Sequence, residues 1–221
     1  MRRILVIIAV TISLTTATIG AAPLTDYEFG NVAFDVGVIA PQVSVTYENG
    51  DGALLSTYGS NYGLNLSATM GIGKPFAVRI HGDLPLVGND QNEGTRYSDQ
   101  NIEFLWGFNL TKPTFLVLYT GFGDYQLGGN RKNAEIFTLL KFGLILDYEY
   151  RDSASLYADF SWSGSATTIT AGVDHKFSEH FAAGLSMNGV VLHSGVTTTG
   201  PLSACYSVDV WYPELAVTYK F

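Results

Sequence analysis

The chain is poor in cysteine, in charge and in basic residues. Cys205 is the one cysteine, so no intramolecular disulfide framework can hold the fold. Charged residues make up 14% of the sequence, whereas an ordinary soluble domain has about 25%. The 12 Lys and Arg are outnumbered by 20 Asp and Glu. This balance argues against a nucleic-acid binder, because such proteins neutralise phosphates with basic side chains.

Long apolar runs are missing beyond the N-terminus. After residue 22 no window of roughly 18 consecutive apolar residues occurs, which excludes a membrane protein built from helices. At the N-terminus, Arg2 and Arg3 precede an apolar stretch that runs to about Ile19 and ends in small residues. This layout predicts a cleaved signal peptide over residues 1–22, with an uncleaved anchor as the alternative. Residues 23–221 are then one exported domain by length.

What the chain has instead is alternation with a period of two. Apolar residues occupy every second position in segments of about ten residues, separated by turn residues. In the segment 62–72, for example, Leu64, Leu66 and Met70 alternate with small or polar residues such as Asn65 and Ser67. This pattern predicts β-strands with one apolar face. A soluble sandwich with an apolar interior has the same periodicity, so alternation alone does not separate it from a membrane barrel.

The connections separate the two architectures better. Short turns near residues 73–75, 111–113, 150–153 and 178–180 alternate with longer stretches at 48–61, 87–99, 124–133 and 194–205. Only Gly164-Ser165 breaks this rule. Tight turns on one side and extended loops on the other are typical of barrels that span a membrane. Aromatic residues near the predicted strand ends, such as Tyr148, Phe177 and Tyr219, fit a girdle at the membrane interface.

The last strand carries the most informative pattern. Val217-Thr218-Tyr219-Lys220-Phe221 alternates and ends in Phe, and with the features above it resembles bacterial outer-membrane β-barrel proteins of the small OmpA-like or porin-like class. The resemblance implies an all-β fold, a transmembrane antiparallel up-and-down barrel of about ten strands, with eight as the alternative. It also implies an outer-membrane location among outer-membrane lipid. Assembly would pass through periplasmic chaperones and the insertion machinery, with Val217, Tyr219 and Phe221 as the insertion signal.

If the apolar residues face lipid, their charged neighbours face the lumen. In a narrow lumen unpaired charges are costly, so we expect an ion-paired network there. The network predicted from the strand alternation comprises Asp35, Arg79, His81, Asp83, Glu103, Lys141, Asp147, Asp159, Asp174 and Lys176. Such a plugged barrel predicts a structural or surface-interaction role. External ligands would then bind through the loops near Asp51 and over residues 89–97, 128–132 and 197–201.

Two other functions stay open at this stage. A carboxylate-rich lumen also suits a small cation-preferring pore. A membrane-embedded hydrolase would need an acid–base pair, and His81 with Asp83, two residues apart on one strand face, is the available candidate. His193 and Ser194 are adjacent, so an extended chain points them to opposite faces. We therefore predict no catalytic, metal or cofactor site and no enzymatic activity.

Overall fold

The computed structural model describes residues 26–48, 54–86, 96–128, 134–192 and 205–221. The predicted signal peptide lies outside these residues. No helix in the described part of the chain is long and apolar enough to cross a membrane. The strands are β1 (Val32–Ile39), β2 (Gln42–Glu48), β3 (Leu54–Ser60), β4 (Gly63–Gly73), β5 (Phe76–Pro85), β6 (Arg96–Thr111), β7 (Thr114–Gly128), β8 (Ala134–Arg151), β9 (Ala154–Ser163), β10 (Ala166–Lys176), β11 (Phe181–Leu192) and β12 (Cys205–Lys220).

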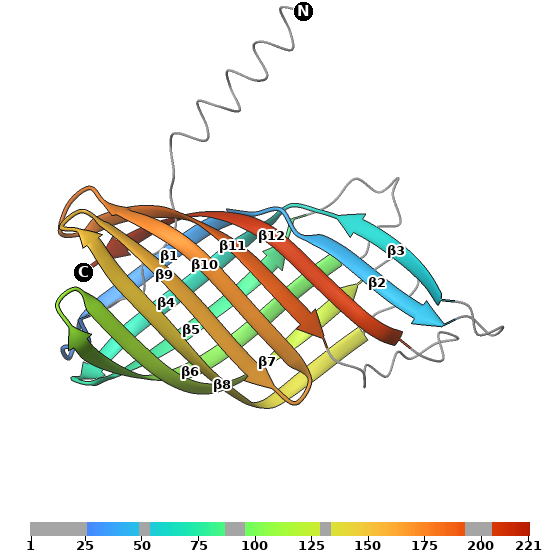
Figure 1. The fold of residues 1–221 in the computed structure, drawn as a ribbon, viewed down its shortest axis with the longest axis horizontal. Helices are drawn as coiled ribbons and strands as arrows, with labels where there is room; N and C mark the ends of the chain where they lie inside the picture. The colour runs from blue at the N-terminus through green and yellow to red at the C-terminus, as the bar shows by residue number, and fades with distance from the viewer. Residues whose placement is uncertain (1–25, 49–53, 87–95, 129–133, 193–204) are drawn as a thin grey trace, which may run out of the picture.

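Ten of these strands close into an antiparallel barrel (Figure 1). The sheet runs from β4 through β12 in chain order, and β1 closes it by pairing with both β4 and β12. Val36, for example, lies opposite Leu66 on one side and Val217 on the other. Closure satisfies the backbone hydrogen-bonding groups without leaving an edge in the hydrocarbon region. The prediction of a ten-stranded barrel is confirmed, and the eight-stranded alternative is wrong.

Strands β2 and β3 form a hairpin that prolongs the wall beyond the closed barrel (Figure 1). β2 continues the line of β1 after a break at Ala40-Pro41 and pairs with the first half of β12, where Trp211 faces Gln42. β3 pairs with β2, so the expectation of one long loop over residues 48–61 is wrong. The expected loop over 87–99 is likewise too long, because β6 already begins at Arg96, opposite Gly128 of β7.

The two ends of the barrel differ. The connections β4–β5, β6–β7, β8–β9 and β10–β11 are short and lie at the end that also holds the C-terminus, which we call the turn end (Figure 1). The opposite, loop end carries the tight connection at Gly164-Ser165. It also carries the longer connections, most of whose residues lie outside the described part of the chain. The alternation of short and long connections follows the predicted pattern.

The outer surface of the barrel is apolar. Outward side chains such as Phe34, Leu66, Phe104 and Leu144 are exposed by 41–47%, while inward neighbours such as Ala33 are buried. Each strand from β4 to β12 has exposed apolar side chains on its outer face. The polar side chains point into the lumen. A soluble sandwich would show the reverse, so this surface is one that faces lipid.

Glycines make room for large side chains inside the lumen. Tyr119 on β7 lies directly opposite Gly143 on β8, and Tyr157 on β9 lies opposite Gly172 on β10. A Cβ atom at Gly172 would approach the Tyr157 ring to 2.5 Å, so only glycine fits beneath that ring. Pairing of a strand glycine with a neighbouring aromatic ring is a known device of barrels. The glycine-rich composition thus allows a small barrel to fill its own interior.

Candidate functional site

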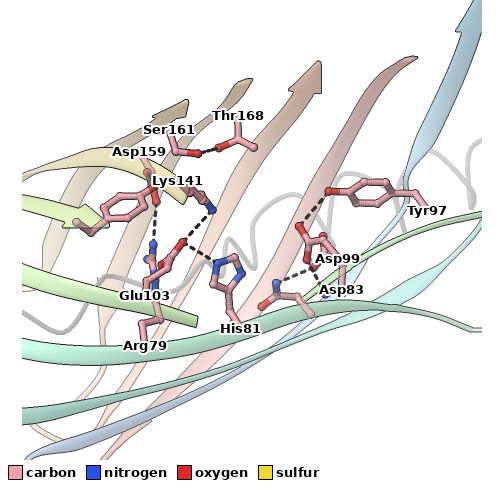
Figure 2. Close-up of polar contacts among 12 residues, drawn as sticks. Arg79, His81, Asp83, Tyr97, Asp99, Glu103, Lys141, Asp159, Ser161 and Thr168 are labelled. Carbon is pink, nitrogen blue, oxygen red and sulfur yellow. Dashed lines mark hydrogen bonds and ion pairs between the residues drawn. The ribbon is translucent and has the colours of Figure 1, made fainter. Parts of the chain in front are cut away.

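Glu103 on β6 is the centre of an ionic layer in the lumen (Figure 2). Its carboxylate lies 2.5 Å from Arg79 Nε, 2.8 Å from Lys141 Nζ and 3.1 Å from His81 Nε2. Its side chain has no exposed surface, and that of Lys141 is 5% exposed. Buried charges of this kind are tolerated only when opposite charges and hydrogen bonds surround them. Strands β5 and β8 supply the basic side chains that surround Glu103 of β6 in this way.

A second carboxylate extends this layer across the lumen. The Arg79 guanidinium also contacts Asp159 of β9 at 3.3 Å, and the Tyr119 hydroxyl donates a hydrogen bond of 2.6 Å to the same carboxylate. Arg79 and Lys141 both lie over the Tyr119 ring, at 5.2 and 5.7 Å from its centroid. The layer therefore connects strands β5 to β9 through side chains alone, and it fixes the positions of two buried cations.

A separate carboxylate pair lies nearer the loop end. Asp83 on β5 faces Asp99 on β6, and the Asp83 backbone N–H donates to Asp99 at 3.0 Å. The Tyr97 hydroxyl also donates to Asp99 at 3.0 Å, while Asp83 accepts from the Asn65 amide at 2.7 Å and from the Tyr212 hydroxyl. Neutral donors thus surround both carboxylates (Figure 2). This arrangement can stabilise the barrel wall, but it supplies no cation.

The ionic layer borders a polar cavity of about 130 Å³ and lies between two apolar clusters. Ser67, Thr168 and Glu214 are among the residues that line the cavity. Toward the loop end lies a cluster of Ile39, Val43, Tyr97, Tyr125, Ala166, Val190, Leu192, Val208, Val210 and Tyr212. Toward the turn end lies a second cluster of Tyr27, Ala33, Ala77, Leu105, Val117, Tyr119 and Ile145. Side chains therefore fill the lumen on both sides of the charges.

The segment before β1 contributes to the turn-end cluster. Tyr27 is 2% exposed, and its ring packs edge-on against Phe115 with centroids 5.8 Å apart. Burial raises the pKa of the Tyr27 hydroxyl. Outside the lumen, Lys74 lies 2.8 Å from Glu28 and 3.1 Å from Asp26, and its hydrogen bonds to these carboxylates raise the pKa of the Lys74 amine. These contacts fold residues 26–28 across the turn end of the barrel.

The structure divides the residues of the predicted lumen network into groups. Arg79, His81, Glu103, Lys141 and Asp159 form the ionic layer. Asp83 joins Asp99, Asp35 accepts a hydrogen bond of 2.6 Å from Thr218, and Lys176 pairs with Glu149 at 2.9 Å. Asp147 and Asp174 are buried at the turn end, and among the described residues no basic group lies within 4.0 Å of either carboxylate.

The candidate acid–base pair of His81 and Asp83 has other partners. His81 is held by Glu103, and Asp83 is held by Asn65 and Tyr212. His193 and Ser194 lie outside the described residues, as do most of the proposed ligand-binding loop positions. Within the described part of the chain, no group of three or more His, Cys, Asp or Glu residues could hold a metal ion.

Sequence reasoning missed the aromatic half of the lumen. Tyr97, Tyr119 and Tyr212 each donate a hydrogen bond to a buried carboxylate. The inward direction of Tyr119 and Tyr212 follows from alternation with exposed neighbours such as Leu118 and Trp211, so the strand pattern could have indicated it. Tyr97 falls in the expected ligand-binding loop over residues 89–97, and this expectation is wrong for Tyr97, which lies on β6 and is 1% exposed. Asp99 lies in the segment 87–99, where the sequence pattern predicts a loop but the structure has the start of β6. The burial of Tyr27 has no sequence signal, because this residue precedes the first strand.

No protein-family model matches the chain, and no curated protein matches it in sequence. Among solved structures, it is similar to the outer membrane protease OmpT from Escherichia coli, with a TM-score of 0.58 and 10% identity over 91% of this chain and 99% of that one. It also matches Neisserial surface protein A, with a TM-score of 0.42 and 11% identity over 86% of this chain and 99% of that one.

A further match is the outer membrane protein AlkL, with a TM-score of 0.46 and 13% identity over 91% of this chain and 95% of that one. At such low identity these likenesses concern the fold alone. The fold shared with OmpT, the closed barrel and the apolar outer surface together identify the architecture: the protein is a bacterial outer-membrane β-barrel and resides in the outer membrane.

Proposed function

We propose that the protein is a sealed, non-enzymatic barrel that acts at the cell surface through its loop end. The observation that carries this proposal is the Glu103 layer, in which three basic side chains converge on one buried carboxylate. Apolar clusters on both sides of that layer support it further, because their side chains pack into the lumen toward both of its ends. A lumen filled in this way resists the passage of ions, and interaction then depends on the exposed loops.

Planar-bilayer recording of the refolded protein tests this proposal. We expect the wild-type barrel to give no discrete conductance steps, with a general porin as the positive control for the assay. A triple variant, Arg79→Ala, Glu103→Ala and Lys141→Ala, removes the central charges together, and Asp159 then keeps its hydrogen bond from the Tyr119 hydroxyl. This variant should pass ions more readily than the wild type. If the wild-type barrel gave cation-selective conductance steps, the sealed-barrel proposal would be wrong and the protein would be a small cation-preferring pore.

We also propose that residues 1–22 are removed on export and that residues 23–221 form the mature barrel domain. Assembly then depends on periplasmic chaperones and on insertion machinery that recognises Val217, Tyr219 and Phe221. Tyr219 and Phe221 are exposed on the outer surface, and their ring centroids lie 4.7 Å apart, which supports their availability to a partner. Deletion of Phe221 should lower the amount of assembled barrel while export continues. Unchanged outer-membrane levels would contradict this role.

A further inference from the structure

The turn end of the lumen contains buried carboxylate oxygens that have no hydrogen-bond partner among the described residues. Asp147 on β8, Ser155 on β9 and Asp174 on β10 are 6%, 3% and 3% exposed. Within the described part of the chain, both carboxylate oxygens of Asp174 and one oxygen of Asp147 accept no hydrogen bond. Unsatisfied buried polar groups are rare in folded proteins, and an unpaired buried carboxylate is the most costly kind.

These residues occupy neighbouring positions on three consecutive strands. Ser155 lies directly opposite Asp174 in the β9–β10 pairing. Asp147 lies opposite Tyr157, which is the next inward position along β9 from Ser155. All three side chains point into the lumen, because they alternate with exposed residues such as Leu146, Leu156 and Val173. The hydroxyl of Ser155 is therefore placed between the two carboxylates.

The local charge is negative. Lys176 is engaged with Glu149 at 2.9 Å, at the rim of the barrel. Lys220 on β12 interacts with Asp147 and Asp174 only at longer range, and Asp35 adds a third carboxylate to the same region. Three carboxyl groups thus share one nearby amine, that of Lys220, among the described residues. This differs from the Glu103 layer, where each carboxylate contacts a cation.

We propose that Asp147, Ser155 and Asp174 bind one hard divalent cation, with Ca²⁺ as the best fit. The donor set consists of oxygen atoms only, which Ca²⁺ and Mg²⁺ prefer over softer metals. The two carboxylates come from strands separated by a third strand, about 9–10 Å apart across the sheet. They are also offset by two residues along the strands. Ca²⁺ tolerates long bonds and irregular geometry, whereas Mg²⁺ demands a compact octahedron. Water completes the coordination, since the protein supplies only two carboxylates here.

Isothermal titration calorimetry with CaCl₂ on the refolded, chelator-treated barrel tests the site. We expect one saturable Ca²⁺ site in the wild type and a loss of affinity of roughly tenfold or more in Asp174→Asn, because ligand charge sets Ca²⁺ affinity. Asp147→Asn should weaken binding comparably, and Ser155→Ala should weaken it less. Asp124→Asn is the matched control, because it removes a carboxylate from the outer side of β7 and should leave the affinity unchanged.

A second measurement keeps the test decisive if one variant refolds poorly. Ca²⁺ should raise the urea midpoint of unfolding of the wild type and of Asp124→Asn, because a ligand that binds only the folded state stabilises it. It should not raise the midpoint of Asp147→Asn or Ser155→Ala to the same extent. Absence of binding up to about 10 mM Ca²⁺ in the wild type would overturn the proposal. Equal affinity in the wild type and in every refolded site variant would overturn it as well.

Discussion

The lumen holds carboxylates in two contrasting environments. Glu103 has no exposed surface and contacts Arg79, His81 and Lys141. Asp174, buried to a similar degree near the turn end, contacts no donor and no cation among the described residues. Burial is similar in both cases, but we expect the two carboxylates to have opposite effects on stability. The contrast teaches that a buried charge stabilises this barrel only where neighbouring strands bring it a partner.

The largest expected effect comes from removing the paired carboxylate. Glu103→Ala leaves Arg79 and Lys141 buried with Asp159 as their remaining acidic neighbour. We expect a loss of about 3–5 kcal/mol in the free energy of unfolding, because breaking a buried ion pair leaves uncompensated charge. Urea titration of the barrel in lipid vesicles measures this loss. A loss no larger than that of a control outside the lumen, such as Asp124→Ala, would show that the ionic layer contributes little to stability.

A somewhat smaller effect tests the distinction between lumen and lipid faces. Leu66 is exposed on the outer surface, while its neighbour Ser67 lines the polar cavity. Leu66→Arg should cost about 2–4 kcal/mol of stability, because it places a charge at a lipid-facing position. Ser67→Arg should cost less, since Asp35 faces it across β1 and β4. The two positions lie at nearly equal depth, so depth cannot explain a difference.

The same refolding titration measures both variants. If Ser67→Arg were the more damaging substitution, the assignment of the two faces would be reversed. The barrel would then resemble a soluble protein with an apolar interior, and the proposal of a surface role in the outer membrane would be lost with it.

A moderate effect is expected from one hydroxyl group. Tyr119→Phe keeps the ring over Gly143 but removes the 2.6 Å hydrogen bond to Asp159. We expect a loss of about 1.5–3 kcal/mol in the free energy of unfolding, as for other hydrogen bonds to charged groups. Tyr148→Phe, on the outer surface, is the control and should change little. If the two substitutions changed the free energy of unfolding equally, the contact with Arg79 alone would be enough to stabilise the Asp159 carboxylate.

The smallest effect should have the opposite sign. Asp174→Asn replaces a buried carboxyl group that accepts no hydrogen bond among the described residues, so in buffer containing a chelator we expect an increase of about 1 kcal/mol in the free energy of unfolding. Glu103→Gln, the same change of a carboxylate to an amide, should be destabilising in the same titration. If both substitutions destabilised the barrel equally, the different surroundings of Glu103 and Asp174 would have no effect on the stability of the barrel.

Much of the fold could be predicted because strand alternation is a local property of the sequence. Leu66 and Ser67 reveal their faces by their positions in the pattern, and the same rule gives the inward direction of Glu103 and Lys141. The strand count was also predictable, since each turn lies between two alternating segments. The hairpin of β2 and β3 was not, because its pairing depends on the prolongation of β12 beyond the closed barrel.

The sequence by itself determined the inward set of charges and the apolar outer surface. Only the tertiary structure decided which of these charges meet, because strand register and barrel closure bring together residues as distant as Arg79 and Asp159. The same closure leaves Asp147 and Asp174 without an ion-pair partner among the described residues, and it carries Tyr212 to Asp83, 129 residues away. A period-two pattern specifies the side of the wall on which a residue lies. It contains no information about which residues face one another across the lumen.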